Sequence, residues 1–149
     1  ELFQIIGYID KTTPEAVRIT QGPLDQEIKV YNSVSIENDE VRFSDFLKTV
    51  YLPYCDKNCV GFIVNNDSME PRIPEKSIVI VNTDIKDLEH RNVGLFLING
   101  KPSIKRAVKQ NGNEYLVSDN PNYDPTFMDQ HTKVSIVGKV IKMIVEDFI

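Results

Sequence analysis

Residues 93–108 read Val-Gly-Leu-Phe-Leu-Ile-Asn-Gly-Lys-Pro-Ser-Ile-Lys-Arg-Ala-Val, and this stretch indicates the fold class. It places two short apolar runs on either side of Asn99-Gly100. An Asn-Gly pair is a strong hairpin signal, because both central residues of a type I′ turn need a positive φ. A second pair, Asn111-Gly112, follows the next run in the same way. The sequence therefore predicts three consecutive antiparallel strands from Val93 to Ser118.

The same kind of run recurs on both sides of this segment. Short stretches rich in Val and Ile, separated by turn residues, are typical of an antiparallel sheet, and they cover Val60–Val64, Ser77–Val81 and Val134–Val145. Gly138 interrupts the last of them and predicts a bulge. The first sixty residues are less regular. They predict strands over Phe3–Ile9 and Glu27–Val34, and a short helix over Ser44–Leu52 that Ser44 caps and Pro53 ends.

Together these patterns predict a mainly β fold of antiparallel strands with at most one or two short helices. The chain of 149 residues has the size of one ordinary domain. No apolar run approaches the ~20 residues that a membrane-spanning helix requires, so we expect no membrane association. The formal net charge is −5, and no basic cluster is longer than Lys105-Arg106. This charge argues against direct DNA binding by this part of the protein.

The cysteines and histidines narrow the chemistry. Cys55 and Cys59 have no neighbouring His or further Cys to complete a four-ligand zinc site, so we expect no metal and no other cofactor. We interpret them as two reduced thiols in a cytoplasmic protein, with a local disulfide as the alternative. His90 and His131 stand in polar, turn-like surroundings. As surface residues they leave no histidine base for a Ser-His triad.

The first candidate for chemistry is Ser68, in the stretch Asn66-Asp67-Ser68-Met69-Glu70-Pro71. The stretch follows a predicted strand, and Pro71 forces a turn. A serine at such a junction can present its hydroxyl among backbone N–H groups, as an acyl-transfer nucleophile and its oxyanion hole require. On these residues alone, a loop in which Asp67 or Ser68 bonds the local backbone explains the pattern as well.

The second candidate is Lys105, on the strand that follows Asn99-Gly100. Period-two alternation gives it small neighbours, Ser103 and Ala107, on its own face of the strand. A lysine acts as a general base only when it is neutral, and burial on an apolar sheet face can lower its pKa. The alternative is an ordinary exposed lysine.

Taken together, the two segments resemble the C-terminal domain of LexA-type and lambdoid phage repressors. The residues that carry this resemblance are Ser68-Met69, Lys105-Arg106, the strands between them, and the trailer Ser118-Asp119-Asn120-Pro121-Asn122-Tyr123-Asp124-Pro125. The order of these segments and the 37 residues from Ser68 to Lys105 match that family. The resemblance is close from Phe62 to Val145 and looser before it. We therefore expect a single domain over 1–149, with the dyad core in 60–149 and a cleavage-site or linker region in 1–59.

The resemblance implies a Ser-Lys dyad in which Ser68 is the nucleophile and Lys105 the general base. The backbone N–H groups of Ser68 and Met69 would form the oxyanion hole. It also implies the LexA and signal-peptidase type of β-ribbon fold, a homodimer, and a helix-turn-helix domain ahead of this one that binds DNA. The expected partners are a second copy of the chain, DNA through that other domain, and a RecA filament or an antirepressor protein.

The bond that such a dyad would cut is less evident, because the family's usual Ala-Gly pair is absent from the chain. Two places compete for it. Lys11-Thr12 lies in a stretch that matches the family's cleavage site, but Thr12 is 56 residues before Ser68, which would require an inserted loop. Ser35-Ile36 or Ile36-Glu37 has the better distance. Ser35 suits a tight pocket for a small side chain better than Ile36 or Lys11.

Two functions therefore stay open. In the first, the chain is the regulatory and dimerisation domain of a phage or SOS-type transcriptional repressor that cleaves itself. In the second, it is a non-cleaving binding module controlled by a protein partner, and Ser68 and Lys105 are a relic. The retained dyad favours the first, and the missing Ala-Gly favours the second. A signal-peptidase-like enzyme acting on other proteins is a weaker third hypothesis, because we expect no membrane anchor.

Overall fold

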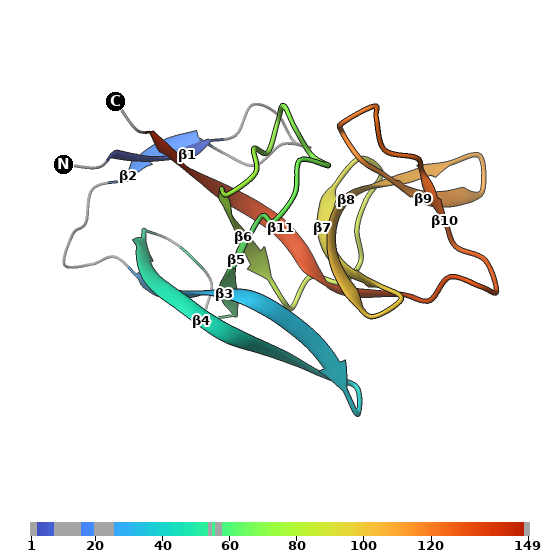
Figure 1. Cartoon of the computed structure of the whole chain (residues 1–149), viewed down its shortest axis with the longest axis horizontal. Helices are drawn as coiled ribbons and strands as arrows, with labels where there is room; N and C mark the ends of the chain where they lie inside the picture. Colours follow the sequence, from blue (N-terminus) through green and yellow to red (C-terminus); the bar gives the residue numbers. More distant parts are fainter. Residues whose placement is uncertain (1–2, 8–15, 20–25, 54, 56–57, 148–149) are drawn as a thin grey trace.

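The computed structural model describes residues 3–7, 16–19, 26–53, 55 and 58–147, and all regular secondary structure in these ranges is β (Figure 1). The strands are β1 (Phe3–Gly7), β2 (Ala16–Ile19), β3 (Gln26–Glu37), β4 (Glu40–Leu52), β5 (Cys59–Ile63), β6 (Ile78–Asn82), β7 (Val93–Ile98), β8 (Lys101–Gln110), β9 (Asn113–Val117), β10 (Thr126–Phe127) and β11 (Val134–Asp147). The prediction of a mainly β fold is confirmed.

The strands form one mixed sheet. Nine of them follow the order β10-β9-β8-β7-β11-β6-β5-β3-β4, while β1 pairs with β11 and β2 pairs with β1. All neighbours are antiparallel except β3 and β5, which run in the same direction. In Figure 1, the long strand β11 runs through the middle of the molecule and links the side of β1 and β6 to the curled sheet of β7, β8 and β9.

Both Asn-Gly turns have the backbone that the sequence predicts. The φ angles are 51° at Asn99, 82° at Gly100, 52° at Asn111 and 79° at Gly112. The turns join β7 to β8 and β8 to β9, in registers that pair Ile98 with Lys101 and Gln110 with Asn113. Three consecutive antiparallel strands from Val93 onward are therefore confirmed.

Gly138 lies at an irregularity of β11, as predicted. The register of β11 against β7 shifts between Ile136 and Gly138. A Cβ atom at Gly138 would lie only 2.5 Å from the carbonyl oxygen of Asn82, at the end of β6. Only glycine therefore lets β11 pass this close to the neighbouring strand.

The predicted helix over Ser44–Leu52 is wrong, because these residues belong to the strand β4. All of them except Asp45 and Leu47 have a register partner on β3, for example Ser44 with Ser33 and Val50 with Ile28. Val50 and Leu52 are buried in a core cluster with residues of β3 and β6. Pairing along the whole of β3 and burial of these side chains outweigh the local capping signal of Ser44.

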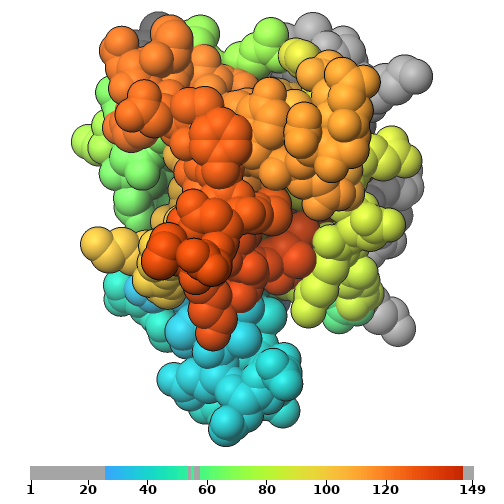
Figure 2. Space-filling view, turned by 90° about the vertical axis from the view of Figure 1, so that its right-hand side faces the viewer, coloured from blue at the N-terminus to red at the C-terminus, as the bar shows by residue number. Residues whose placement is uncertain are grey.

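The long β3–β4 hairpin extends beyond the body of the protein, at the bottom of Figure 2. Near its base, β3 pairs with β5 through Val30 and Tyr31. Since β5 ends at Ile63 while β3 continues to Glu37, the outer half of β3 runs past the loop that follows β5. That loop contains Ser68.

Candidate active site

Ser68 lies in a tight turn between β5 and β6, and its residue is 2% exposed. Its backbone N–H donates to Asn66 Oδ1 at 3.0 Å. Met69, which follows it, is fully buried in the main core cluster, and its carbonyl accepts a bond from the Ile73 N–H at 2.9 Å. The side chain that bonds the local backbone is therefore that of Asn66 and not that of Ser68. The buried Met69 side chain anchors the turn.

The two backbone amides predicted for the oxyanion hole differ. The Ser68 N–H is occupied by Asn66 Oδ1. The Met69 N–H makes no hydrogen bond with any residue in the described part of the chain. Of the two, Met69 is thus the one with a donor available to a developing negative charge.

Lys105 is buried in the middle of β8, with 8% of the residue exposed. Its Nζ donates to Ser118 Oγ at 2.7 Å and lies 5.4 Å from the centre of the Tyr123 ring. Burial lowers the pKa of Lys105 below its ordinary value, because removal from water disfavours the charged form. The exposed-lysine interpretation is therefore wrong, and the environment is the one that a neutral amine needs.

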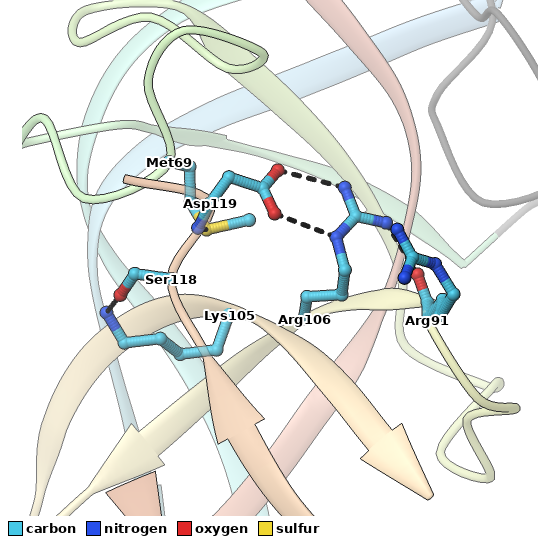
Figure 3. A network of polar contacts seen from close by, with 6 residues as sticks. All are labelled: Met69, Arg91, Lys105, Arg106, Ser118 and Asp119. Atoms are coloured by element: carbon cyan, nitrogen blue, oxygen red, sulfur yellow. Dashed lines mark hydrogen bonds and ion pairs between the residues drawn. The ribbon is translucent and has the colours of Figure 1, made fainter. Parts of the chain in front are cut away.

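Next to it, Arg106 points to the other side of the strand and forms a two-pronged ion pair with Asp119 (Figure 3). Its Nε lies 2.8 Å from Asp119 Oδ1 and its Nη2 lies 2.9 Å from Oδ2. Arg106 Nη1 also donates to the Arg91 carbonyl at 2.6 Å. The Arg106 side chain is only 4% exposed, so the pair is shielded from water. The Arg106–Asp119 ion pair joins the segment that follows β9 to the strand β8.

The same segment contacts the turn that carries Ser68. The Asn120 N–H donates to the Ser68 carbonyl at 2.9 Å, and the Asn120 side-chain amide donates to the Asp67 carbonyl at 3.0 Å. The Asp119 N–H contacts the Met69 sulfur at 3.4 Å. Ser118 and Asn120 are two residues apart, a span of at most ~7 Å. Residues 118–120 thus bridge Ser68 and Lys105, although Nζ donates to Ser118 and makes no bond to Ser68 among the described contacts.

Tyr123 lies over this junction. Its hydroxyl donates to Asp67 Oδ1 at 2.5 Å, while its ring faces Lys105 Nζ. The hydrogen bond to Asp67 is the main reason that the pKa of Tyr123 is raised. The sequence pattern indicates only a packing role for this residue, and it marks neither Ser118 nor Asp119 as a contact. Their place directly after a strand that pairs with the Lys105 strand is the signal that could have found them.

The predicted cleavage positions fall in two places. Lys11 and Thr12 lie outside the described residues. Ser35, Ile36 and Glu37 end β3, where they pair with Arg42, Val41 and Glu40 of β4. The hairpin turn follows at once, with Asn38 and Asp39 at φ 50° and 62°.

A cavity of about 160 Å³ lies between β3 and the segments that precede Ser68 and Lys105. Its lining includes Asn32 and Ser33 of β3, Val64 and Asn66 before Ser68, and Ser103 and Ile104 before Lys105. Asn65 Nδ2 donates across it to Asn32 Oδ1 at 2.9 Å. The middle of β3, at Asn32 and Ser33, therefore lies beside the segments that lead to Ser68 and Lys105, whereas Ser35 and Ile36 line a different cavity.

Other expectations concern the cysteines and histidines. Cys55 and Cys59 are thiols, as expected. His131 is exposed, as expected, whereas His90 is half-buried. The Nδ1 atom of His90 accepts a hydrogen bond from the Lys109 N–H at 3.0 Å. No helix in the described ranges could cross a membrane.

A buried serine and a buried lysine of lowered pKa lie on one β scaffold, and these are the two residue types that a Ser-Lys peptidase uses. Comparison with protein families identifies the family: the one described as Peptidase S24-like matches residues 22–141. The chain belongs to the Peptidase S24-like family, whose members include the C-terminal domains of LexA-type and phage repressors. No curated protein matches the chain significantly.

Proposed function

We propose that the chain is the C-terminal regulatory and dimerisation domain of a transcriptional repressor of phage or SOS type, and that Ser68 and Lys105 cleave a bond of its own chain. The observation that carries the proposal is the bridge of residues 118–120, which binds Lys105 at one end and the Ser68 backbone at the other. This bridge supports the proposal because it brings the Ser68 turn and an amine of lowered pKa to one junction of the fold.

In the proposed reaction, neutral Lys105 takes the proton of the Ser68 hydroxyl as Oγ attacks the carbonyl carbon of the scissile bond. The negative charge that develops on the carbonyl oxygen faces the Met69 N–H. The intermediate collapses to an acyl-serine, and the protonated Lys105 returns its proton to the leaving amine. Water, deprotonated by Lys105, then hydrolyses the acyl-serine and regenerates the Ser68 hydroxyl.

The proposed substrate is the end of β3, at Ser35-Ile36 or Ile36-Glu37. The middle of this strand lines a cavity beside the segments that precede both candidates, and Ser35 is small. Its residues are paired with β4 in an antiparallel ladder, in which alternate residues direct their carbonyls at the partner strand. Cleavage therefore requires the tip of the hairpin to open and move toward Ser68. A partner such as a RecA filament would act by favouring that opened form.

A second candidate function is a binding module that is controlled by an antirepressor protein and does not cleave. Two observations favour it. The Lys105 amine bonds Ser118 rather than Ser68, and the hairpin that holds the candidate bonds is fully paired to its tip. In both functions the domain dimerises, and DNA is bound by a helix-turn-helix domain that precedes it.

Mass spectrometry of the full-length repressor after incubation at about pH 10 tests the proposal. The wild type is compared with Ser68→Ala, and with Thr132→Ala as a control that removes a hydroxyl from the loop before β11. We expect fragments in the wild type and the control alone, with a new terminus after Ser35 or Ile36. Intact protein in all three would reject self-cleavage and leave the binding module.

A further inference from the structure

Ser118 is placed by the strand register to face Lys105. The last residue of β9, Val117, pairs with Arg106 of β8. Continuing this antiparallel register by one step sets Ser118 opposite Lys105, and residues directly opposite each other point to the same face of a sheet. The 2.7 Å bond from Lys105 Nζ to Ser118 Oγ is the contact that this pairing produces.

The backbone of Ser118 is held on its C-terminal side. Asp119 binds the buried guanidinium of Arg106 through both carboxylate oxygens, and Asn120 binds the Ser68 carbonyl. The Ser118 hydroxyl is therefore an acceptor in a defined place, attached to the same segment that contacts the nucleophile turn.

A fixed acceptor matters for a lysine base because its side chain has four rotatable bonds. A neutral amine has two N–H groups and one lone pair. If one N–H is held by Ser118, the direction of the lone pair is restricted, and it remains available for the Ser68 proton. The bond to Ser118 thus orients the base without consuming the electron pair on which catalysis depends.

We propose that Ser118 is a positioning residue for Lys105: its hydroxyl holds the amine beside the nucleophile turn and sets how it takes up a proton. This inference rests on the proposed function for its effect on cleavage, but the coupling of Ser118 to Lys105 can be measured without any cleavage. The hydroxyl accepts more strongly from an ammonium than from an amine, so it favours the protonated form of Lys105.

The experiment uses the full-length protein with Ser118→Ala, the conservative Ser118→Thr, and Asn122→Ala as the control. Asn122 belongs to the same loop and its side chain is exposed. In a Ser68→Ala background, the Lys105 side-chain Cε–Hε signal is followed by NMR as pH is raised. Ser68-dependent self-cleavage is measured over the same pH range with Ser68 present.

We expect Ser118→Ala to lower the midpoint of the Lys105 titration by about half a unit to one unit, because an acceptor for the charged form is lost. Cleavage at high pH should slow by about 10- to 100-fold. Ser118→Thr should restore both, and Asn122→Ala should match the wild type. A purely structural role would lower the melting temperature without moving the Lys105 midpoint.

A Lys105 midpoint that is the same in Ser118→Ala and the wild type would overturn the inference, whether or not the protein cleaves itself. In a second outcome, Ser118→Ala moves the Lys105 midpoint, Ser118→Thr restores it, and the wild type gives no cleavage fragments. That outcome supports the positioning role of Ser118 and rejects self-cleavage alone. The Lys105 titration and the self-cleavage measurement therefore separate the two proposals.

Discussion

Arg106 and Asp119 form a buried, two-pronged ion pair that joins the strand of the candidate base to the segment that reaches the candidate nucleophile. The two contacts measure 2.8 Å and 2.9 Å, and the Asp119 side chain is 11% exposed. Paired charges in such a place contribute geometry more than net stability, but removing one partner leaves an uncompensated buried charge. The Arg106–Asp119 ion pair therefore stabilises the geometry of the candidate site from an adjacent position.

Asp119→Ala should lower the free energy of unfolding by about 3 kcal/mol, because the Arg106 guanidinium loses its carboxylate in a buried place. Urea denaturation measures the change. Asp124→Ala, in the same loop and exposed, is the matched control and should stay within about 0.5 kcal/mol of the wild type. A loss below about 1 kcal/mol in Asp119→Ala would show that the pair does not hold the segment.

The lowered pKa of Lys105 makes stability depend on pH in a defined direction. Between this lowered value and ~10.4, the unfolded chain binds more protons at Lys105 than the folded one, so stability rises with pH. The unfolding free energy of the wild type relative to Lys105→Met should therefore increase across that window and level off above it. A difference that is flat with pH, measured by urea denaturation, would mean that the buried lysine titrates normally.

The double change Ile36→Ala with Glu37→Gly should speed Ser68-dependent self-cleavage by at least ~10-fold, because a smaller side chain fits a tight pocket beside the scissile bond. It also loosens the tip of the β3–β4 hairpin. The rate is followed by gel densitometry, with Glu37→Gly alone as the control for loosening. If the double variant cuts no faster than the single one, the bond lies outside 35–37, and Lys11-Thr12 becomes the next position to test.

Gly138→Ala should destabilise the protein by about 2 kcal/mol, since the added methyl group meets the Asn82 carbonyl oxygen and β11 must shift. Thermal unfolding followed by circular dichroism measures this. The control is Gly112→Asn, because asparagine tolerates the left-handed φ of that turn and the space around Gly112 is open. Equal stability of Gly138→Ala and the wild type would show that β11 has room to move away from β6.

Local patterns predicted most of the strands. Asn99-Gly100 and Asn111-Gly112 place their turns because the required φ angles are a property of those residues themselves. The helix prediction over Ser44–Leu52 failed for the opposite reason. Its capping signal is local, whereas the partner that decides the matter, β3, occupies residues 26–37 and offers a ladder along the whole segment.

The sequence by itself determined the β class, the two tight turns, the glycine at the bulge, and the serine and lysine that mark the family. Each of these depends on the conformational preference or chemistry of a few adjacent residues. Only the tertiary structure decided that Ser118 receives the Lys105 amine, that Asp119 holds Arg106, and that β3 runs parallel to β5 past the Ser68 turn. The first two contacts cross the β8–β9 hairpin and depend on side-chain positions beyond the end of β9, which the turn residues alone do not specify. The third joins strands about thirty residues apart, and it follows from strand order, which local preference does not determine.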